Sequence, residues 1–233
     1  MTNKTKWLAA IKQPRIVVPF KDQVKPDRIR YAFTTGCDIA EIRIDLFDNE
    51  DPAHILKEIM KFRKYPSILT IRSKSEGGRW TGDEHDRLTL YRRFISSINA
   101  VDIELSATEI FNDVVKVADD HNKTVIASFH DFNQTPDINE LTAVIKQARA
   151  KGADIVKIAT MINKPSDIQQ LALVLIEHSD TNLVVIGMGP KGKITRVFFP
   201  ALGSMMTFAQ LDKQTAPGQL DLDSMVYDLY RYY

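Results

Sequence analysis

The chain has 233 residues, of which 44% are hydrophobic and 26% are charged, and its formal net charge is +1. These values are ordinary for a folded globular protein, and the length suits one large α/β domain. The balanced charge argues against nucleic acid or an anionic membrane surface as a partner.

The single cysteine, Cys37, cannot form an internal disulfide, and we expect it to be a small packed residue. Residues 1–13 lack the apolar stretch of a signal peptide. No apolar run approaches the roughly 20 residues that cross a bilayer. The sequence therefore predicts a soluble cytoplasmic protein with no membrane partner.

Eight short β-rich runs recur along the chain at intervals of roughly 20–35 residues, the length of a βα unit. In chain order they are Arg15–Pro19, Ile39–Leu46, Ser67–Arg72, Ala100–Leu105, Thr124–Phe129, Asp154–Ala159, Asn182–Gly187 and Ser204–Ala209. Helical patterns lie between some of these runs, the last of them with Ser166 as a candidate N-cap. These patterns cover Pro52–Phe62, Asp83–Ile98, Asn139–Lys151 and Ser166–His178.

Strands that alternate with helices predict a parallel sheet, and eight such units favour a closed (β/α)₈ TIM barrel. We expect one catalytic domain over residues 1–233. An open, doubly wound sheet is the alternative. Against it, no Gly-x-Gly-x-x-Gly follows the first strand, and no Walker A motif is present.

Charged residues alternate with apolar ones in several of the predicted strands. In the second strand Glu41, Arg43 and Asp45 alternate with isoleucines and a leucine, so period-two geometry places the charges on one face. The same pattern gives further candidates for the barrel lumen: Thr70, Arg72, Asp102, Glu104, Ser128, His130 and Lys157. Together with Arg196 the charges nearly balance, as a buried polar lumen requires. The alternative is a sheet that is solvated on one face.

Nine motifs, in order and over nearly the whole chain, resemble those of one enzyme family. They are Glu41-Ile-Arg43-Ile-Asp45, Arg72-Ser-Lys-Ser-Glu76-Gly77-Gly78, Asp102-Ile-Glu104, Ser128-Phe-His130-Asp131-Phe132, Asp154-Ile-Val-Lys157-Ile-Ala159, Met188-Gly189, Thr195-Arg196, Leu202-Gly203-Ser204 and Ala216-Pro217-Gly218-Gln219. The chain resembles type I 3-dehydroquinate dehydratase, the Schiff-base class of that shikimate-pathway enzyme.

The resemblance implies a role for each matching residue. Lys157 corresponds to the Schiff-base lysine and His130 to the acid–base histidine, with Glu76 as its orienting partner. The positions that correspond to substrate contacts and apolar lining are Glu41, Arg43, Arg72, Arg196, Thr215, Gln219, Met188 and Phe208. The resemblance further implies 3-dehydroquinate as substrate, no metal, no cofactor and a homodimer.

The chain departs from the family pattern at a few positions. Thr195 and Thr215 stand where serine is usual, and Ile186 stands where methionine is frequent. The loop Gly189-Pro190-Lys191-Gly192 is also unusual. Because threonine keeps the hydroxyl group, we expect these changes to tune substrate binding rather than abolish it.

The reaction explains why these residue types are needed. A proton alpha to a ketone is too weakly acidic for a side-chain base at neutral pH, and conversion of the ketone to an iminium supplies an electron sink. Burial and neighbouring arginines favour the neutral Lys157 amine that this step requires, whereas nearby carboxylates oppose it. A histidine then serves as base and as acid. Arg196 offers a planar fork for a carboxylate, and residues 214–219 read as a lid.

Plainer alternatives exist for these residues. His130 could be structural, Lys157 a strand-end lysine in water, Arg196 a surface arginine and residues 214–219 an ordinary loop. The acidic cluster around His85 reads as a helix start rather than a metal site, because no spaced His or Cys partner exists. At the level of function, the rivals are a Schiff-base aldolase that holds phosphate at residues 187–193, and an inactive barrel that only binds a carboxylate.

Overall fold

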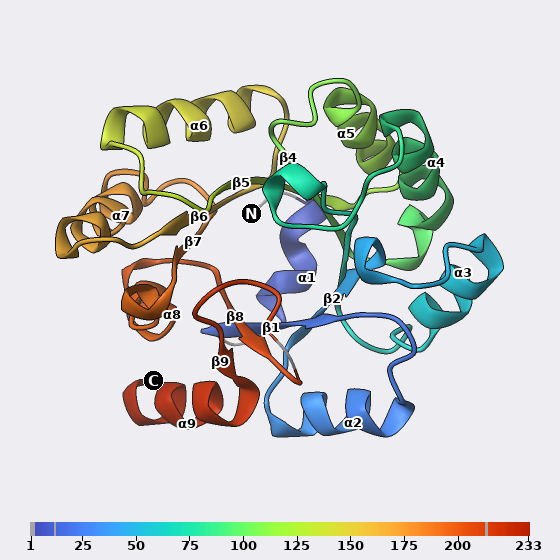
Figure 1. Ribbon diagram of the computed structural model, residues 1–233, viewed down its shortest axis with the longest axis horizontal. Coiled ribbons are helices and arrows are strands. Elements are labelled where there is room, and N and C mark those ends of the chain that lie inside the picture. Colours follow the sequence, from blue (N-terminus) through green and yellow to red (C-terminus); the bar gives the residue numbers. More distant parts are fainter. Residues whose placement is uncertain (1–2, 12, 213) are drawn as a thin grey trace.

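Parallel strands curl round the centre of the molecule, and helices cover their outer side (Figure 1). The computed structural model describes residues 3–11, 13–212 and 214–233. The strands are β1 (Arg15–Phe20), β2 (Ile39–Arg43), β3 (Ser67–Thr70), β4 (Ala100–Glu104), β5 (Thr124–Asp131), β6 (Ile155–Met161), β7 (Leu183–Met188), β8 (Met206–Gln210) and β9 (Leu220–Asp221). They pair in parallel in the order β7-β6-β5-β4-β3-β2-β1-β8-β9. Each predicted run overlaps one of the first eight strands, with ends that differ by up to three residues, and the TIM-barrel fold is confirmed.

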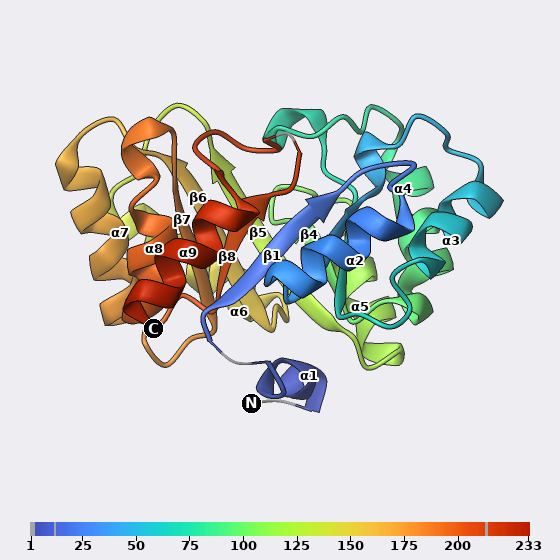
Figure 2. The ribbon, with the colours of Figure 1, turned by 90° about the horizontal axis from the view of Figure 1, so that it is seen from below.

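Seven of the described helices connect successive strands on the outside of the sheet: α2 (Pro26–Thr35), α3 (Pro52–Met60), α4 (Glu84–Phe94), α5 (Phe111–Asp120), α6 (Ile138–Ala150), α7 (Pro165–Glu177) and α8 (Thr195–Phe198) (Figures 1 and 2). In the described ranges, α1 (Lys6–Ala9) precedes the first strand and α9 (Leu222–Tyr232) follows the last. The four helical patterns are confirmed, with ends that differ by a few residues. None of the helices in the described ranges is long and apolar enough to cross a membrane.

The predicted N-cap of α7 was wrong. The helix begins at Pro165, and Lys164 rather than Ser166 occupies the N-cap position. Proline is favoured in the first helical turn because it has no backbone N–H to satisfy there. The Asp167 carboxylate accepts hydrogen bonds from the backbone N–H groups of Asn163 and Lys164, at 2.8 and 2.9 Å, and holds the entry to the helix.

The regular ladder of strands is interrupted between β7 and β8 within the described part of the chain. At this seam the Met205 N–H donates to the Leu183 carbonyl at 2.8 Å. The Val185 N–H donates to the Ser204 hydroxyl at 3.0 Å. A side chain therefore takes the place of a backbone partner and links the last strands of the barrel.

Strand β2 is shorter than the alternating pattern indicates. It ends at Arg43, and residues Ile44–Leu46 form a 3₁₀ turn, so Asp45 does not continue the strand as expected. The turn brings the Asp45 carboxylate back to the Arg43 guanidinium, with N–O distances of 2.9 and 2.7 Å. Arg43 and Asp45 therefore form a local ion pair that is buried beside the lumen.

Two apolar cores lie on opposite sides of the sheet. The outer core fills the space between strands and helices. The inner core occupies the barrel and includes Val17, Ile39, Ile68, Ala100, Ile126, Ile155, Val184 and Met206. Glu41 and Lys157 each lie two residues beyond an inner-core isoleucine on the same strand, so they share its face. An apolar base thus supports a charged upper lumen.

The short helix α1 lies beneath the barrel, at the opposite end from the active-site loops (Figure 2). Its Leu8 is fully buried in the inner core, and the Leu8 carbonyl accepts two hydrogen bonds from the Arg15 guanidinium, at 3.2 and 3.0 Å. The Trp7 indole N–H donates to the Thr124 hydroxyl at 2.9 Å. This helix was not predicted, because four residues are too few to display a helical period.

Replacing Leu8 by alanine should lower the free energy of unfolding by about 2–5 kcal/mol, since it leaves a cavity in a closed core. Urea unfolding followed by circular dichroism would measure this loss. Ile11, next to the helix, is only half-buried at the edge of the same core, so Ile11→Ala is the matched control with a smaller effect. If Leu8→Ala were as stable as the unmodified chain, the packing of Leu8 would not contribute to the stability of the inner core.

Candidate active site

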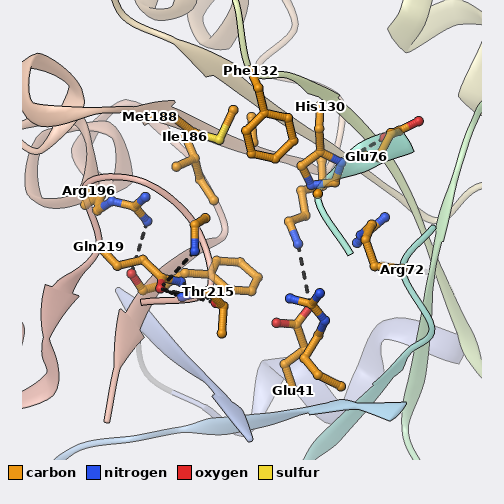
Figure 3. Close-up of a pocket in the computed structure, with 16 residues that line it drawn as sticks. Glu41, Arg72, Glu76, His130, Phe132, Ile186, Met188, Arg196, Thr215 and Gln219 are labelled. Atoms are coloured by element: carbon orange, nitrogen blue, oxygen red, sulfur yellow. Dashed lines mark hydrogen bonds and ion pairs between the residues drawn. The ribbon is translucent and has the colours of Figure 1, made fainter. Parts of the chain in front are cut away.

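One cavity at the carboxyl ends of the strands is lined by all eleven of the predicted site residues (Figure 3). They are Glu41, Arg43, Arg72, Glu76, His130, Lys157, Met188, Arg196, Thr215, Phe208 and Gln219. The cavity has a volume of about 50 Å³. In barrel enzymes this end of the strands carries the site, because the βα loops converge there.

Lys157 lies on β6 with its side chain in the lumen and 7% of it exposed. Its Nζ donates to Asp102 Oδ2 at 3.0 Å and lies 3.8 Å from Glu41 Oε1. The amine also lies 4.3 Å from the centre of the Phe208 ring. This amine is therefore not in open water, and the plainer alternative of a solvated strand-end lysine is wrong.

A shared ion network surrounds this amine. Asp102 Oδ1 accepts from Arg72 Nη2 at 2.7 Å and from the Ser128 hydroxyl at 2.7 Å. Burial alone would raise the pKa of Asp102, but the Arg72 and Lys157 cations hold it well below its usual range. Because Asp102 contacts both cations, its carboxylate fixes their relative position.

Behind Arg72 a second carboxylate extends the network towards α4. Glu104 Oε1 lies 3.6 Å from Arg72 Nη1 and accepts from the Ser73 N–H at 2.6 Å. Its other oxygen contacts the Arg87 guanidinium, which is 1% exposed. The lumen charges of both signs are thus compensated, as predicted, but Arg87 was not among the residues that the sequence indicated.

His130 and Glu76 form a buried pair on the other side of the cavity. His130 is the second-last residue of β5, and Glu76 lies in the 3₁₀ turn Lys74–Glu76 after β3. The distance from His130 Nδ1 to Glu76 Oε2 is 2.9 Å. Phe132 lies nearly parallel to the imidazole, with ring centres 6.2 Å apart and an interplanar angle of 18°. These contacts restrict the imidazole to one orientation.

Burial shifts both members of this pair away from their charged forms. It raises the pKa of Glu76 to about 7, although a hydrogen bond from Ser106 and the Arg72 charge act against it. Burial, together with the Arg72 and Lys157 cations, lowers the pKa of His130 well below its usual value. The imidazole is therefore neutral near pH 7, and Glu76 is the member that titrates there.

Arg196 and the loop after β8 close the opposite side of the cavity. The Arg196 guanidinium donates to the carbonyls of Phe208, Pro217 and Gly218, at 3.1, 3.2 and 3.0 Å. Burial lowers the pKa of Arg196 to about 10. A guanidinium has five N–H donors, so donors remain for a ligand in the cavity. Arg196 is buried, and the plainer alternative of a surface arginine is wrong.

Gln219 fastens the same loop from within. Its Oε1 accepts from the backbone N–H groups of Thr215 and Ala216, at 2.7 and 3.3 Å. The Thr215 hydroxyl and the Gln219 side chain also bond to each other, at 3.0–3.2 Å. The two-residue strand β9 follows Gln219 directly and pairs with β8. The loop is therefore held over the cavity by its own side chains.

The family whose sequence model matches residues 16–232 is described as type I 3-dehydroquinase. The chain belongs to the type I 3-dehydroquinase family. It is 42% identical over 201 residues to the 3-dehydroquinate dehydratase of Methanosarcina acetivorans, and the match covers 82% of this chain and 83% of that one.

Solved structures of the type I 3-dehydroquinase family are similar throughout. The 3-dehydroquinate dehydratase of Aquifex aeolicus VF5 is 29% identical, has a TM-score of 0.85, and the match covers 94% of this chain and 99% of that one. The type I 3-dehydroquinate dehydratase of Clostridium difficile, solved with covalently modified comenic acid, is 29% identical with a TM-score of 0.83 and coverages of 94% and 91%. Membership of this family decides against the sugar-phosphate aldolase.

Several lining residues were not predicted from the type I 3-dehydroquinase motifs. Phe132 belongs to one of the motifs but was assigned no role. The position of its ring accounts for the glycine at residue 77. Gly77 has φ +80°, and a Cβ there would lie 2.4 Å from the Phe132 ring, so only glycine fits. Three small or apolar residues complete the lining: Ala159, Ile186 and Ala216.

Two of the departures from the type I 3-dehydroquinase pattern have a structural account. The Thr195 hydroxyl accepts from the Gly187 N–H at 2.9 Å and donates to the Gly192 carbonyl at 2.7 Å. Threonine can thus make the hydrogen bonds that a serine hydroxyl would make, and its methyl group fills space beside Gly187. Thr215 likewise bonds through its hydroxyl to Gln219.

A cluster outside the cavity contains a histidine to which the sequence assigned no role. His54 Nε2 lies 2.7 Å from Asp22 Oδ1, and Glu58 is close to both. Asp22 already accepts from the backbone N–H groups of Gln23, Asp48 and Asn49, and Glu58 pairs with a lysine at 2.6 Å. These contacts hold the loop after β1 against α3.

Glu76→Gln should stabilise the protein above neutral pH while lowering its activity. The folded pKa of about 7 exceeds the ordinary value of 4.5, so the folded state keeps a proton that the unfolded state loses between these pH values. Stability therefore falls as pH rises from about 4.5 to 7. Glu76→Gln removes this cost of ionisation. Its effect on the free energy of unfolding should therefore be more favourable at pH 8 than at pH 5, by about 1–3 kcal/mol.

Urea unfolding at pH 5 and pH 8 checks this expectation. Glu109→Gln, which removes an exposed carboxylate outside the cavity lining, is the matched control. A Glu76→Gln variant that is equally destabilised at both pH values would show that the carboxylate is not strained by its burial.

Proposed function

We propose that this chain removes water from 3-dehydroquinate by syn elimination to give 3-dehydroshikimate, through an imine on Lys157. This is the hydro-lyase reaction of the shikimate pathway that the names of the relatives describe. One observation supports the roles that we propose for the residues. The Lys157 amine and the His130–Glu76 pair lie on the same small cavity, where an imine on the first would hold a ring against the second.

The reaction begins at Lys157. Its unprotonated amine adds to the substrate ketone, and loss of one water gives the iminium. The Phe208 ring, 4.3 Å from Nζ, and the Asp102 carboxylate stabilise the positive charge that the nitrogen then carries. The C. difficile relative was solved with covalently modified comenic acid, which is in keeping with covalent chemistry in this family.

His130 moves the protons of the elimination. With Nδ1 bonded to Glu76, Nε2 is the nitrogen that can take the proton alpha to the iminium. The electron pair of that C–H bond forms an enamine, and the β-hydroxyl group leaves as water when His130 returns the proton to it. A second water hydrolyses the product imine and restores Lys157, so one water is lost overall.

The arginines and the lid hold the substrate in place for these steps. The N–H groups of Arg196 that are not bonded to the lid grip the substrate carboxylate, and Glu41, Arg43 and Arg72 contact the ring hydroxyls. Residues 214–219 lie over the cavity, so they lift to admit the substrate and close again over it. A second hollow of about 830 Å³ borders the lid and shares Arg43, Gly77 and Thr215 with the cavity, which makes it the entrance.

Two copies of the chain are proposed to associate, as the family resemblance implies. Large apolar side chains are exposed at the N-cap of α8 (Ile194), on α8 (Phe198) and on the neighbouring helix α9 (Tyr227 and Tyr230), and they offer a surface for this contact. A cytoplasmic location is proposed as well, in keeping with the buried free thiol of Cys37. Light scattering of the purified protein would test the dimer, and a single-chain mass would refute it. The absence of a nucleic-acid partner stays a prediction from the net charge.

A direct assay tests the proposed reaction. Purified protein is mixed with 3-dehydroquinate, and the absorbance of the conjugated enone product is followed. Borohydride added during turnover should reduce the imine and leave a covalent adduct on Lys157, which peptide mass spectrometry locates. A protein that binds the substrate but gives neither product nor adduct would be the inactive, carboxylate-binding barrel instead.

A further inference from the structure

A serine outside the cavity lining extends the His130–Glu76 pair by one residue. Ser106 lies in the loop that follows β4, and its hydroxyl donates to Glu76 Oε1. The other oxygen of the same carboxylate, Oε2, lies 2.9 Å from His130 Nδ1. Three groups from three successive strand ends therefore form one hydrogen-bonded chain, in which the hydroxyl group is farthest from the cavity.

The ionisation of Glu76 depends on the groups that surround it. Burial, Glu104 and Asp102 favour its neutral form, and Arg72 favours its charged form. Ser106 also favours the charged form, because its hydroxyl donates a hydrogen bond to the carboxylate. Because burial raises the pKa of Glu76 to about 7, the charged and the neutral carboxyl group have similar populations at neutral pH.

The state of Glu76 decides which nitrogen of His130 carries the proton. An ionised Glu76 only accepts, so the neutral imidazole keeps its proton on Nδ1 and leaves the Nε2 lone pair free. A neutral Glu76 can donate its own proton to Nδ1, and the imidazole proton then resides on Nε2. In that second arrangement Nε2 cannot take a proton from the substrate.

We propose that Ser106 is a positioning residue, which keeps Glu76 ionised and oriented so that His130 presents a free Nε2 lone pair to the substrate. This inference rests on the proposed function, since it concerns the base of that reaction. Ser106 acts through Glu76 and is not itself expected to touch the substrate, because it does not line the cavity.

The pH dependence of kcat/KM tests this role with three variants. Ser106→Ala removes the donor, so the acid limb of the profile should move to higher pH by roughly half a unit to one unit. Activity at pH 7 should fall several-fold, whereas the plateau at higher pH should stay within about twofold of the original. Ser106→Thr keeps the hydroxyl and should restore the original profile. Thr108→Ala, an exposed hydroxyl in the same loop, should leave it unchanged.

Nitrogen chemical shifts of His130 give a second, independent readout. In labelled protein near pH 7 the Ser106→Ala variant should show more of the Nε2-protonated tautomer than the unmodified chain. An unshifted acid limb together with an unchanged tautomer ratio would overturn the inference, and so would a uniform loss of activity at all pH values. The unmodified chain separates the two hypotheses: if it fails to dehydrate 3-dehydroquinate, the proposed function is wrong irrespective of Ser106.

Discussion

Lys157→Ala should abolish turnover of 3-dehydroquinate, with kcat lowered on the order of 10⁴-fold or more. Without the amine no imine forms, and the ketone alone does not acidify the alpha proton enough for a histidine base. The fold should survive, because Asp102 keeps its bonds to Arg72 and Ser128 when the amine is removed. The enone absorbance assay measures the loss.

Borohydride trapping makes this result specific. The Lys157→Ala variant should give no covalent adduct, whereas the control Lys146→Ala, an exposed lysine on α6, should give the full adduct and the full rate. Circular dichroism and the thermal midpoint show whether the fold is intact. A Lys157→Ala variant that turns over at the normal rate would refute the Schiff-base scheme.

His130→Ala should let the imine form but stop the reaction at the proton transfer. General acid–base catalysis contributes about 10²–10⁴-fold, and kcat should fall by that factor. The adduct on Lys157 should still appear after borohydride treatment, with a mass that corresponds to the reduced substrate imine. Loss of rate with retention of the adduct is the pattern that separates His130 from Lys157.

His85→Ala is the matched control for this experiment, because His85 is exposed and distant from the cavity lining. It should keep both the rate and the adduct. If His130→Ala also runs at full rate, another group takes the proton, and the roles of Glu76 and Ser106 fall with that of His130.

Local periodicity explains why the site was predictable. Glu41, Lys157 and His130 lie on strands, where alternate side chains share a face, so the sequence places them in the lumen without any tertiary knowledge. The eleven predicted site residues line the cavity, whereas the lumen candidates Asp102, Glu104 and Ser128 lie behind it in the ion network. Asp45 was expected on the same strand face, but alternation of charged and apolar residues does not reveal that the strand ends at Arg43.

The residues that the sequence missed act across elements or occupy very short ones. Arg87 projects from α4 and Ser106 from a loop, and their partners are 17 and 30 residues away along the chain. Such contacts have no period and depend on the final packing. The helices α2, α5, α8 and α9 were also missed, although α5 carries an apolar stripe that a closer reading of periodicity would have found.

The carboxylates of the lumen are shared rather than paired one to one. Asp102 contacts Arg72 and Lys157, and Glu104 contacts Arg72 and Arg87. A mutational scan that alters one position at a time would therefore score nearly every member as intolerant, since each removal leaves a neighbour uncompensated. Divergence in this part of the family should proceed by coupled exchanges, and covariation among aligned homologues should trace the network before any single position is seen to vary.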